Sequence, residues 1–161
     1  MTLRVFSNPT LADFYMVCHR IPEDEREQAE AFTGRVYDPE ATAAAYSLRD
    51  GPKWVIANDE GPIIVAGFDM VRPGVWQDWL FSVPEAWDKH WRSVTKICRR
   101  VMDAMLRADA HRLQCVSLAS RIHAHRWYRP LGLQLEGTLR GYGVNGEDAL
   151  MFARLRSSDG Q

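Results

Sequence analysis

The stretch Arg121–Leu155 reads RIHAHRWYRPLGLQLEGTLRGYGVNGEDALMFARL and holds the clearest structural signals in the chain. Its first part predicts a short helix over residues 122–131, which ends at Gly132 because glycine adopts a left-handed backbone at little cost. Apolar and polar residues then alternate in two runs, 133–139 and 149–155, as they do in half-buried strands. The Asn-Gly pair between the runs predicts a turn inside a glycine-containing loop. We therefore expect a helix followed by two paired strands.

The same stretch resembles a known family. The first match rests on five residues at characteristic spacings: Ala124, Trp127, Tyr128, Gly132 and Leu133. The continuation LEGTLRGYGVNGEDALMF adds further matching positions: Glu136-Gly137, Arg140, Gly146 and Asp148. The pattern resembles the tail of the GNAT N-acetyltransferases, and the continuation resembles the branch that includes the ribosomal-protein N-terminal acetyltransferases. The match covers about the last quarter of the chain.

Length and composition indicate one ordinary globular domain. The chain has 161 residues, of which 46% are hydrophobic and 25% are charged, which is enough for a single sizeable core. We expect the domain to span residues 1–156 and residues 157–161 to form a flexible tail. The first residues lack the pattern of a signal peptide, and no apolar run approaches the roughly 20 residues that cross a membrane. Three widely spaced cysteines outside any CxxC motif favour a reduced, cytoplasmic protein.

Charge is distributed unevenly along the chain. Residues 1–86 contain 7 Lys and Arg against 14 Asp and Glu, whereas residues 87–140 contain 11 against 4, with four histidines. Such asymmetry favours an anionic partner for the second half, and a nucleotide-like cofactor and nucleic acid both fit. The acidic run Glu23-Asp24-Glu25 follows a proline and is explained by a helix start, where the helix dipole favours anions. The alternative interpretation is a lip that attracts an amine substrate.

The order of predicted elements extends the resemblance to most of the chain. A first strand near Leu3 and Val5 and several helices precede three strands in a meander, at residues 54–57, 63–71 and 75–83. The longest helix is predicted over about residues 87–107, followed by a strand at 112–118 and then by the opening stretch. This order predicts an α/β fold with a mixed, largely antiparallel central sheet flanked by helices. It is also the element order of the GNAT fold.

The resemblance implies where an acyl donor binds. In the family, the strand at residues 75–83 splays away from the strand at residues 112–118, and acetyl-CoA lies in the space between them. The implied backbone contacts come from Phe81, Ser82 and Val83. The pyrophosphate would lie at the start of the next helix, where free N–H groups and the positive end of the dipole attract anions.

The loop after that strand departs from the family pattern. Relatives place glycines there, whereas this chain reads PEAWDKHWRSVTK, without a glycine. One interpretation is that side chains bind the phosphates instead, from Lys89, Arg92, Ser93 and Lys96. The other is a degraded pocket, as in degenerate or phage-encoded members, on a fold that serves binding or assembly.

Two residues are the candidates for catalysis. Tyr128 matches the family tyrosine that protonates the departing CoA thiolate, although a buried aromatic with a satisfied hydroxyl is the competing interpretation. Asp78 lies on the third meander strand, where relatives often place a carboxylate base, and Glu85 and His90 are alternatives. Arg121 replaces an asparagine that many relatives have. The pair His123 and His125 lacks the further ligands of a zinc site, so no metal is expected.

These observations predict an acyl-CoA-dependent N-acyltransferase that transfers acetyl from acetyl-CoA to a primary amine by direct attack. A protein N-terminus or a small amine is favoured as the acceptor, because an α-amino group with a pKa of about 7.7–8.0 needs less deprotonation than a lysine at about 10.4. The alternative is a non-catalytic binding or assembly protein on the GNAT fold, and nucleic-acid binding ranks third. A membrane partner is not expected, and a homodimer remains an option.

Overall fold

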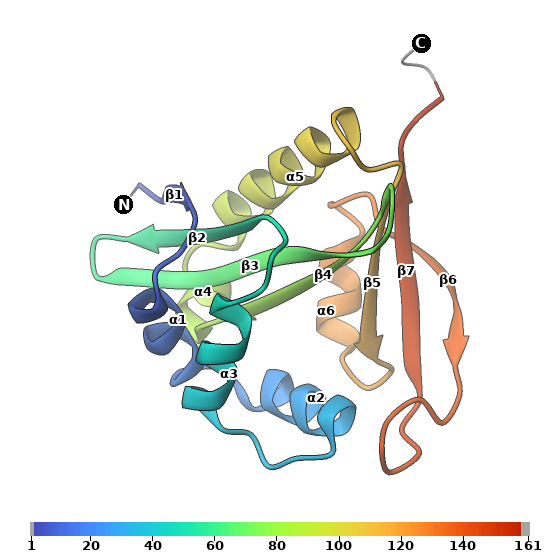
Figure 1. The fold of residues 1–161 in the computed structure, drawn as a ribbon, viewed down its shortest axis with the longest axis horizontal. Helices are drawn as coiled ribbons and strands as arrows, with labels where there is room; N and C mark the ends of the chain where they lie inside the picture. Colours follow the sequence, from blue (N-terminus) through green and yellow to red (C-terminus); the bar gives the residue numbers. More distant parts are fainter. Residues whose placement is uncertain (1, 159–161) are drawn as a thin grey trace.

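The computed structural model describes residues 2–158 and contains one seven-stranded sheet (Figure 1). The strands are β1 (Arg4–Ser7), β2 (Lys53–Asn58), β3 (Gly61–Arg72), β4 (Val75–Ser82), β5 (Arg112–Leu118), β6 (Gln134–Leu139) and β7 (Ala149–Leu155). Their order in the sheet is β1-β2-β3-β4-β5-β7-β6, and every neighbouring pair is antiparallel except β4 and β5. The predicted mixed, largely antiparallel sheet is therefore confirmed.

Helices cover both faces of this sheet and one end of it. They are α1 (Leu11–Cys18), α2 (Glu23–Thr33), α3 (Pro39–Ser47), α4 (Pro84–Asp88), α5 (Trp91–Arg107) and α6 (Ile122–Tyr128). Phe14 of α1 packs with Trp79 of β4 in one buried cluster. Met102 of α5 and Tyr128 of α6 pack with Leu113 of β5 in another. Helix α2 lies across the end of the sheet where β4 and β5 finish (Figure 1).

The long helix expected from residue 87 is interrupted. Pro84 starts the short helix α4, as proline does at a first helical position. The backbone leaves the helical conformation at His90, with φ −128° and ψ 8°, and α5 begins at Trp91. The predicted start at Trp87 is wrong, because Trp87 belongs to α4 and its indole is held by contacts outside the helix. Helix α6 likewise ends at Tyr128, and a turn occupies the residues before Gly132.

Strands β4 and β5 pair only over their first residues. Their parallel register joins Val75 to Arg112, Trp76 to Leu113 and Gln77 to Gln114. Beyond this point both strands continue but diverge, with α6 lying over the space between them (Figure 1). We call the space between residues 78–82 and residues 115–118 the gap. Its narrow end lies beside Gln77 and Gln114, and its wide end lies beside Ser82 and Leu118. The splay implied by the resemblance is present.

The chain end is tied to the sheet up to Arg156. The backbone N–H of Arg156 donates to the carbonyl of His111 at 2.9 Å, and its guanidinium donates to the carbonyls of Leu106, Ala108 and Ala110. Of the predicted tail, residues 157 and 158 lie outside any helix or strand, and residues 159–161 lie outside the described residues. Within the described part of the chain, no helix combines the length and apolar character needed to span a bilayer.

Candidate active site

Helix α2 bridges the two diverging strands at the wide end of the gap. The backbone N–H of Ser82 donates to Glu25 at 3.0 Å, and the Ser82 hydroxyl donates to the same carboxylate. One turn along α2, the side-chain carbonyl of Gln28 accepts the backbone N–H of Leu118 on β5 at 2.9 Å. The helix therefore supplies the acceptors that strand pairing would otherwise provide. The sequence explained the acidic run as a helix start, with an amine-attracting lip as the alternative, and did not predict this contact.

Strand alternation decides which backbone groups face the gap. The carbonyl of Gly74 accepts the N–H of Arg112 at 3.1 Å, whereas the N–H of Val83 donates to Ile63 on β3 at 3.0 Å. Backbone groups of successive residues point to opposite edges of a strand, so the even-numbered residues of β4 face the gap. The expectation that Phe81 and Val83 offer backbone contacts there is corrected. Such contacts belong to the even-numbered residues 78, 80 and 82.

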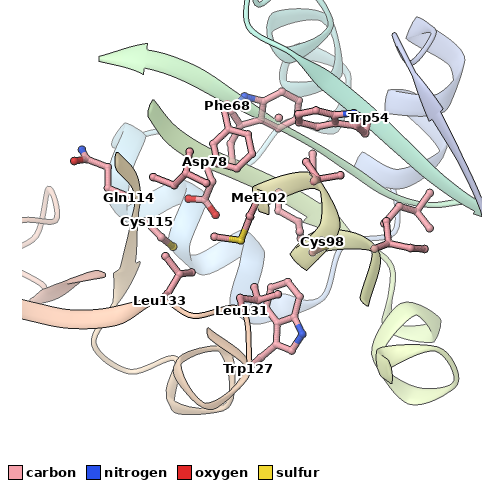
Figure 2. Close-up of a pocket in the computed structure, with 18 residues that line it drawn as sticks. Trp54, Phe68, Asp78, Cys98, Met102, Gln114, Cys115, Trp127, Leu131 and Leu133 are labelled. Carbon is pink, nitrogen blue, oxygen red and sulfur yellow. The ribbon is translucent and has the colours of Figure 1, made fainter. Parts of the chain in front are cut away.

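The narrow end opens into a cavity of about 60 Å³ beneath α5 (Figure 2). Sulfur-containing and apolar side chains form most of the wall, including Cys98, Met102 and Leu133. Among the described residues that line the cavity, Asp78 alone carries a charge, and its carboxylate points inward between Met102 and Cys115 (Figure 2). Burial raises the pKa of Asp78 to about 6, although a hydrogen bond with the Cys115 thiol and the charge of Arg121 act in the opposite direction.

Tyr128 lies close to the same groups from the side of α6. Its side chain is 6% exposed and packs edge-on against Phe152, with ring centroids 5.0 Å apart. Burial raises the pKa of Tyr128 well above its ordinary value, and the neighbouring Cys115 and Asp78 raise it further. The phenol therefore keeps its proton at neutral pH. The structure thus brings the two predicted catalytic residues, Asp78 and Tyr128, together at the gap.

A partly buried cation lies at the start of α6. The Nε–H of Arg121 donates to Asp24 of α2 at 2.9 Å, and the arginine side chain is only 13% exposed. Although burial alone would raise the pKa of Asp24, the charge and hydrogen bond of Arg121 hold it below its ordinary value. His123 lies 3.1 Å from the same carboxylate. This ion pair fixes α2 against α6 beside the wide end.

Solved structures of acetyltransferases share this arrangement of elements. The ribosomal-protein alanine N-acetyltransferase of Escherichia coli aligns over 99% of this chain and 97% of its own, with 16% identity and a TM-score of 0.71. Its Brucella melitensis counterpart aligns over 96% and 99%, with 15% identity and a TM-score of 0.72. A GNAT phosphinothricin acetyltransferase of Sinorhizobium meliloti, solved with acetyl-CoA, aligns over 98% and 90%, with 15% identity and a TM-score of 0.71.

The chain has the GNAT fold. The resemblance drawn from residues 121–155 is confirmed at this level. In sequence alone, no protein-family model and no curated protein matches the chain. The fold is consequently established by structural likeness, and the chemistry depends on the residues themselves.

Within this GNAT fold, Trp87 of the glycine-free loop turns inward, whereas Trp91 is 48% exposed. The indole N–H of Trp87 donates to the Ser82 hydroxyl at 2.7 Å, and its ring meets Trp127 of α6 edge-on, with centroids 4.7 Å apart. Trp127 in turn donates to Thr95 of α5 at 2.9 Å. The two tryptophans therefore join the β4–α5 connection to α6 and cover the gap on that side.

None of the residues predicted to bind phosphate lines the cavity that holds Asp78. Lys89, Arg92 and Ser93 are exposed around the start of α5, and none forms an ion pair within residues 2–158. The guanidinium of Arg92 lies 5.1 Å from the ring centre of Trp91. Of the alternative bases, Glu85 pairs with Arg20, and its own helical backbone together with that arginine lowers its pKa. His90 occupies the break before α5.

Proposed function

We propose that the chain is an acyl-CoA-dependent N-acyltransferase that moves acetyl from acetyl-CoA to a primary amine. The observation that carries this proposal is the buried pair of Asp78 and Tyr128 beside a gap between two parallel strands. A carboxylate with a raised pKa and a protonated phenol form the acid–base set that amide formation from a thioester requires. The resemblance to N-acetyltransferase structures, one of them solved with acetyl-CoA, supports the same chemistry.

The donor would lie along the gap. The backbone of Leu80 faces the gap between the two bridged ends and is suited to pair with the amide groups of a pantetheine arm. Phe81 and Ser82 end the same strand, and Val83 links it to α4. The pyrophosphate would meet Lys89, Arg92 and Ser93 near the first turn of α5, where the unpaired N–H groups and the helix dipole favour an anion.

The reaction needs a nucleophile, a carbonyl held still and a proton for the thiolate. The amine nitrogen attacks the thioester carbon, the new C–N bond forms, and the C–S bond breaks. Tyr128 supplies the proton to the leaving sulfur. Asp78 is the base that the sequence suggests. A protein N-terminus or a small amine fits a weak base best, because its pKa of about 7.7–8.0 leaves part of it neutral near pH 7.

A second function is supported by the tryptophan cover. Trp87 and Trp127 fill the side of the gap where relatives have glycine, and the Ser82 N–H is already occupied by Glu25. If these contacts always exclude CoA from the gap, the chain would use the GNAT fold as a binding or assembly protein. The two functions differ in one measurable property, which is affinity for CoA.

The test is CoA binding together with acetyl transfer. CoA at about 100 times its dissociation constant should add roughly 2.7 kcal/mol to the free energy of unfolding, which a thermal shift detects. Acetyl-CoA should then release free thiol with at least one acceptor from a panel of ethylamine, spermidine, lysine and an alanine-terminated peptide. Duplex DNA is run beside CoA at two salt concentrations. The acyltransferase proposal fails if neither a shift nor thiol release appears at millimolar CoA. Salt-sensitive DNA binding with no effect of CoA would favour the nucleic-acid function.

A further inference from the structure

Glu25 is a buried carboxylate at the gap, and it has no role in the reaction described above. It is 7% exposed, and its two oxygens accept the N–H and the hydroxyl of Ser82. The hydroxyl of Ser82 is held in turn by the indole N–H of Trp87. Isolated buried carboxylates are unfavourable unless they are hydrogen-bonded. Here the gap-facing edge of β4 supplies the bonds, which places the carboxylate in the gap itself rather than on the surface of α2.

A cleft leads toward this end of the gap. It measures about 490 Å³, lies between α2 and the loop that joins β6 to β7, and reaches Leu118 and Ser120 at the end of β5. Gln28, which binds the Leu118 N–H, is one helical turn from Glu25. Three carboxylates line the cleft, Glu27, Glu30 and Glu147. Arg35 is the one cation among the described residues that line the cleft, so its net charge favours an ammonium group. By this route an ammonium group would approach the wide end of the gap, where Glu25 binds Ser82.

We propose that Glu25 accepts the proton from the acceptor amine. The inference rests on the acyltransferase function and changes the identity of its base. The ammonium form R–NH₃⁺ transfers one proton to the Glu25 carboxylate and becomes R–NH₂. Its nitrogen attacks the thioester carbon, the C–S bond breaks, and the nitrogen loses a second proton while the thiolate gains one from Tyr128. The second proton restores the Tyr128 hydroxyl through water, and Glu25 returns its proton to solvent. The net products are the amide, CoA thiol and one H⁺.

The surroundings of Glu25 suit this role. Burial raises the pKa of Glu25 to about 7, the bonds from Ser82 and the charge of Arg121 lower it, and the charge of Asp24 raises it. The other titratable groups facing it are Cys18 of α1 and Tyr37, whose own pKa values are raised mainly by burial. Cys18 and Tyr37 remain neutral near pH 7. Glu25 can therefore gain and lose a proton while the charge of these two neighbours stays constant. A base whose pKa lies near the working pH is the most efficient.

The experiment compares acceptors of different basicity. Trifluoroethylamine and a peptide hydrazide, both largely neutral near pH 7, are added to the amine panel above. In Glu25→Gln, which keeps the size and an acceptor for the Ser82 N–H, kcat/KM should fall roughly 100-fold for the basic amines. It should fall far less for the weakly basic ones, which need no base. Glu23→Gln, an exposed charge removed from the same helix, should leave both rates unchanged.

Two further measurements separate catalysis from packing. The pH at which kcat/KM for a basic amine rises should stay near the wild-type value in Glu25→Asp, at a lower rate. In Glu25→Gln the rise should move to higher pH and follow the ionisation of the amine itself. Asp78→Asn should keep the wild-type ratio between basic and weakly basic acceptors. An equal loss for both kinds of acceptor in Glu25→Gln, or no loss for either, overturns the assignment while acyl transfer stands. A wild-type protein that acetylates nothing overturns the proposed function, and the assignment with it.

Discussion

The two ends of the β4–β5 gap hold a buried carboxylate in opposite ways. At the narrow end Asp78 faces a cavity walled by sulfur and apolar groups, with the Cys115 thiol as a hydrogen-bond partner. At the wide end Glu25 is fixed by both polar groups of Ser82. Burial raises both pKa values, but only Glu25 takes the place of a missing strand partner. The strand ends at the wide end are therefore held by α2, whereas at the narrow end Asp78 faces a cavity.

The largest expected effect concerns the narrow end and its dependence on pH. The pKa of Asp78 in the folded protein is about 6, above its ordinary value of 3.8, so the folded state binds more protons between these values. Stability contributed by the protonated group is present below this window and is lost as pH rises through it. The free energy of unfolding of Asp78→Asn relative to wild type should therefore rise by about 3 kcal/mol between about pH 3 and about pH 8.

Urea denaturation at the two pH values measures this change. Comparing the same variant at both pH values removes any effect of the amide that does not depend on pH. Asp59→Asn, an exposed carboxylate in the turn between β2 and β3, is the matched control and should show no such change. A pH-independent difference in Asp78→Asn would mean that the cavity hydrates this carboxylate, and the contrast between the two ends would be lost.

The next effect concerns Tyr128, which lies beside the narrow end. Replacing it with Phe keeps the ring packed against Phe152 and removes only the hydroxyl. If the phenol protonates the leaving thiolate, turnover should fall roughly 100-fold while CoA affinity hardly changes. Thiol release and thermal shift measure the two quantities, and Tyr142→Phe at the exposed loop serves as the control. Full activity together with a loss of about 0.5–1.5 kcal/mol of stability would identify Tyr128 as a packing residue instead.

Local patterns predicted the strands well because each strand is marked by its own residues. Alternating apolar positions bounded by turn residues located β5 at Arg112–Leu118, as the structure has it. Which alternate residues of β4 direct their backbone groups into the gap could not be predicted in the same way. Which of Ser82 and Val83 faces the gap depends on hydrogen bonds to β3, which lie outside the strand's own sequence. The position of the strand was therefore predictable from its sequence, but the direction of each backbone N–H was not.

Contacts between residues distant in sequence explain the features that the sequence did not predict. Glu25 and Ser82 are separated by 57 positions, and the acidic run has a sufficient local explanation in the helix dipole. Nothing in that run distinguishes the buried Glu25 from the exposed Glu23. The break before α5 is similar, since no proline or glycine marks residues 89 and 90. Trp87 is held instead by Ser82 and Trp127, which only the folded chain brings near.

The smallest expected effect tests the bridge at the wide end. Gln28→Ala removes the acceptor of the Leu118 N–H, which lies on a buried residue of β5. An unpaired buried donor costs about 1–3 kcal/mol, and we expect the low end of this range because water can reach the N–H from the adjoining cleft. Hydrogen exchange at the Leu118 amide should accelerate, whereas exchange at Leu113, at the paired end of β5, should change only with global stability. Glu27→Ala, next to it on α2, is the matched control. If Leu118 stays protected in Gln28→Ala, the strands hold their splay without the Gln28 contact, and Glu25 is the residue that joins α2 to the gap-facing edge of β4.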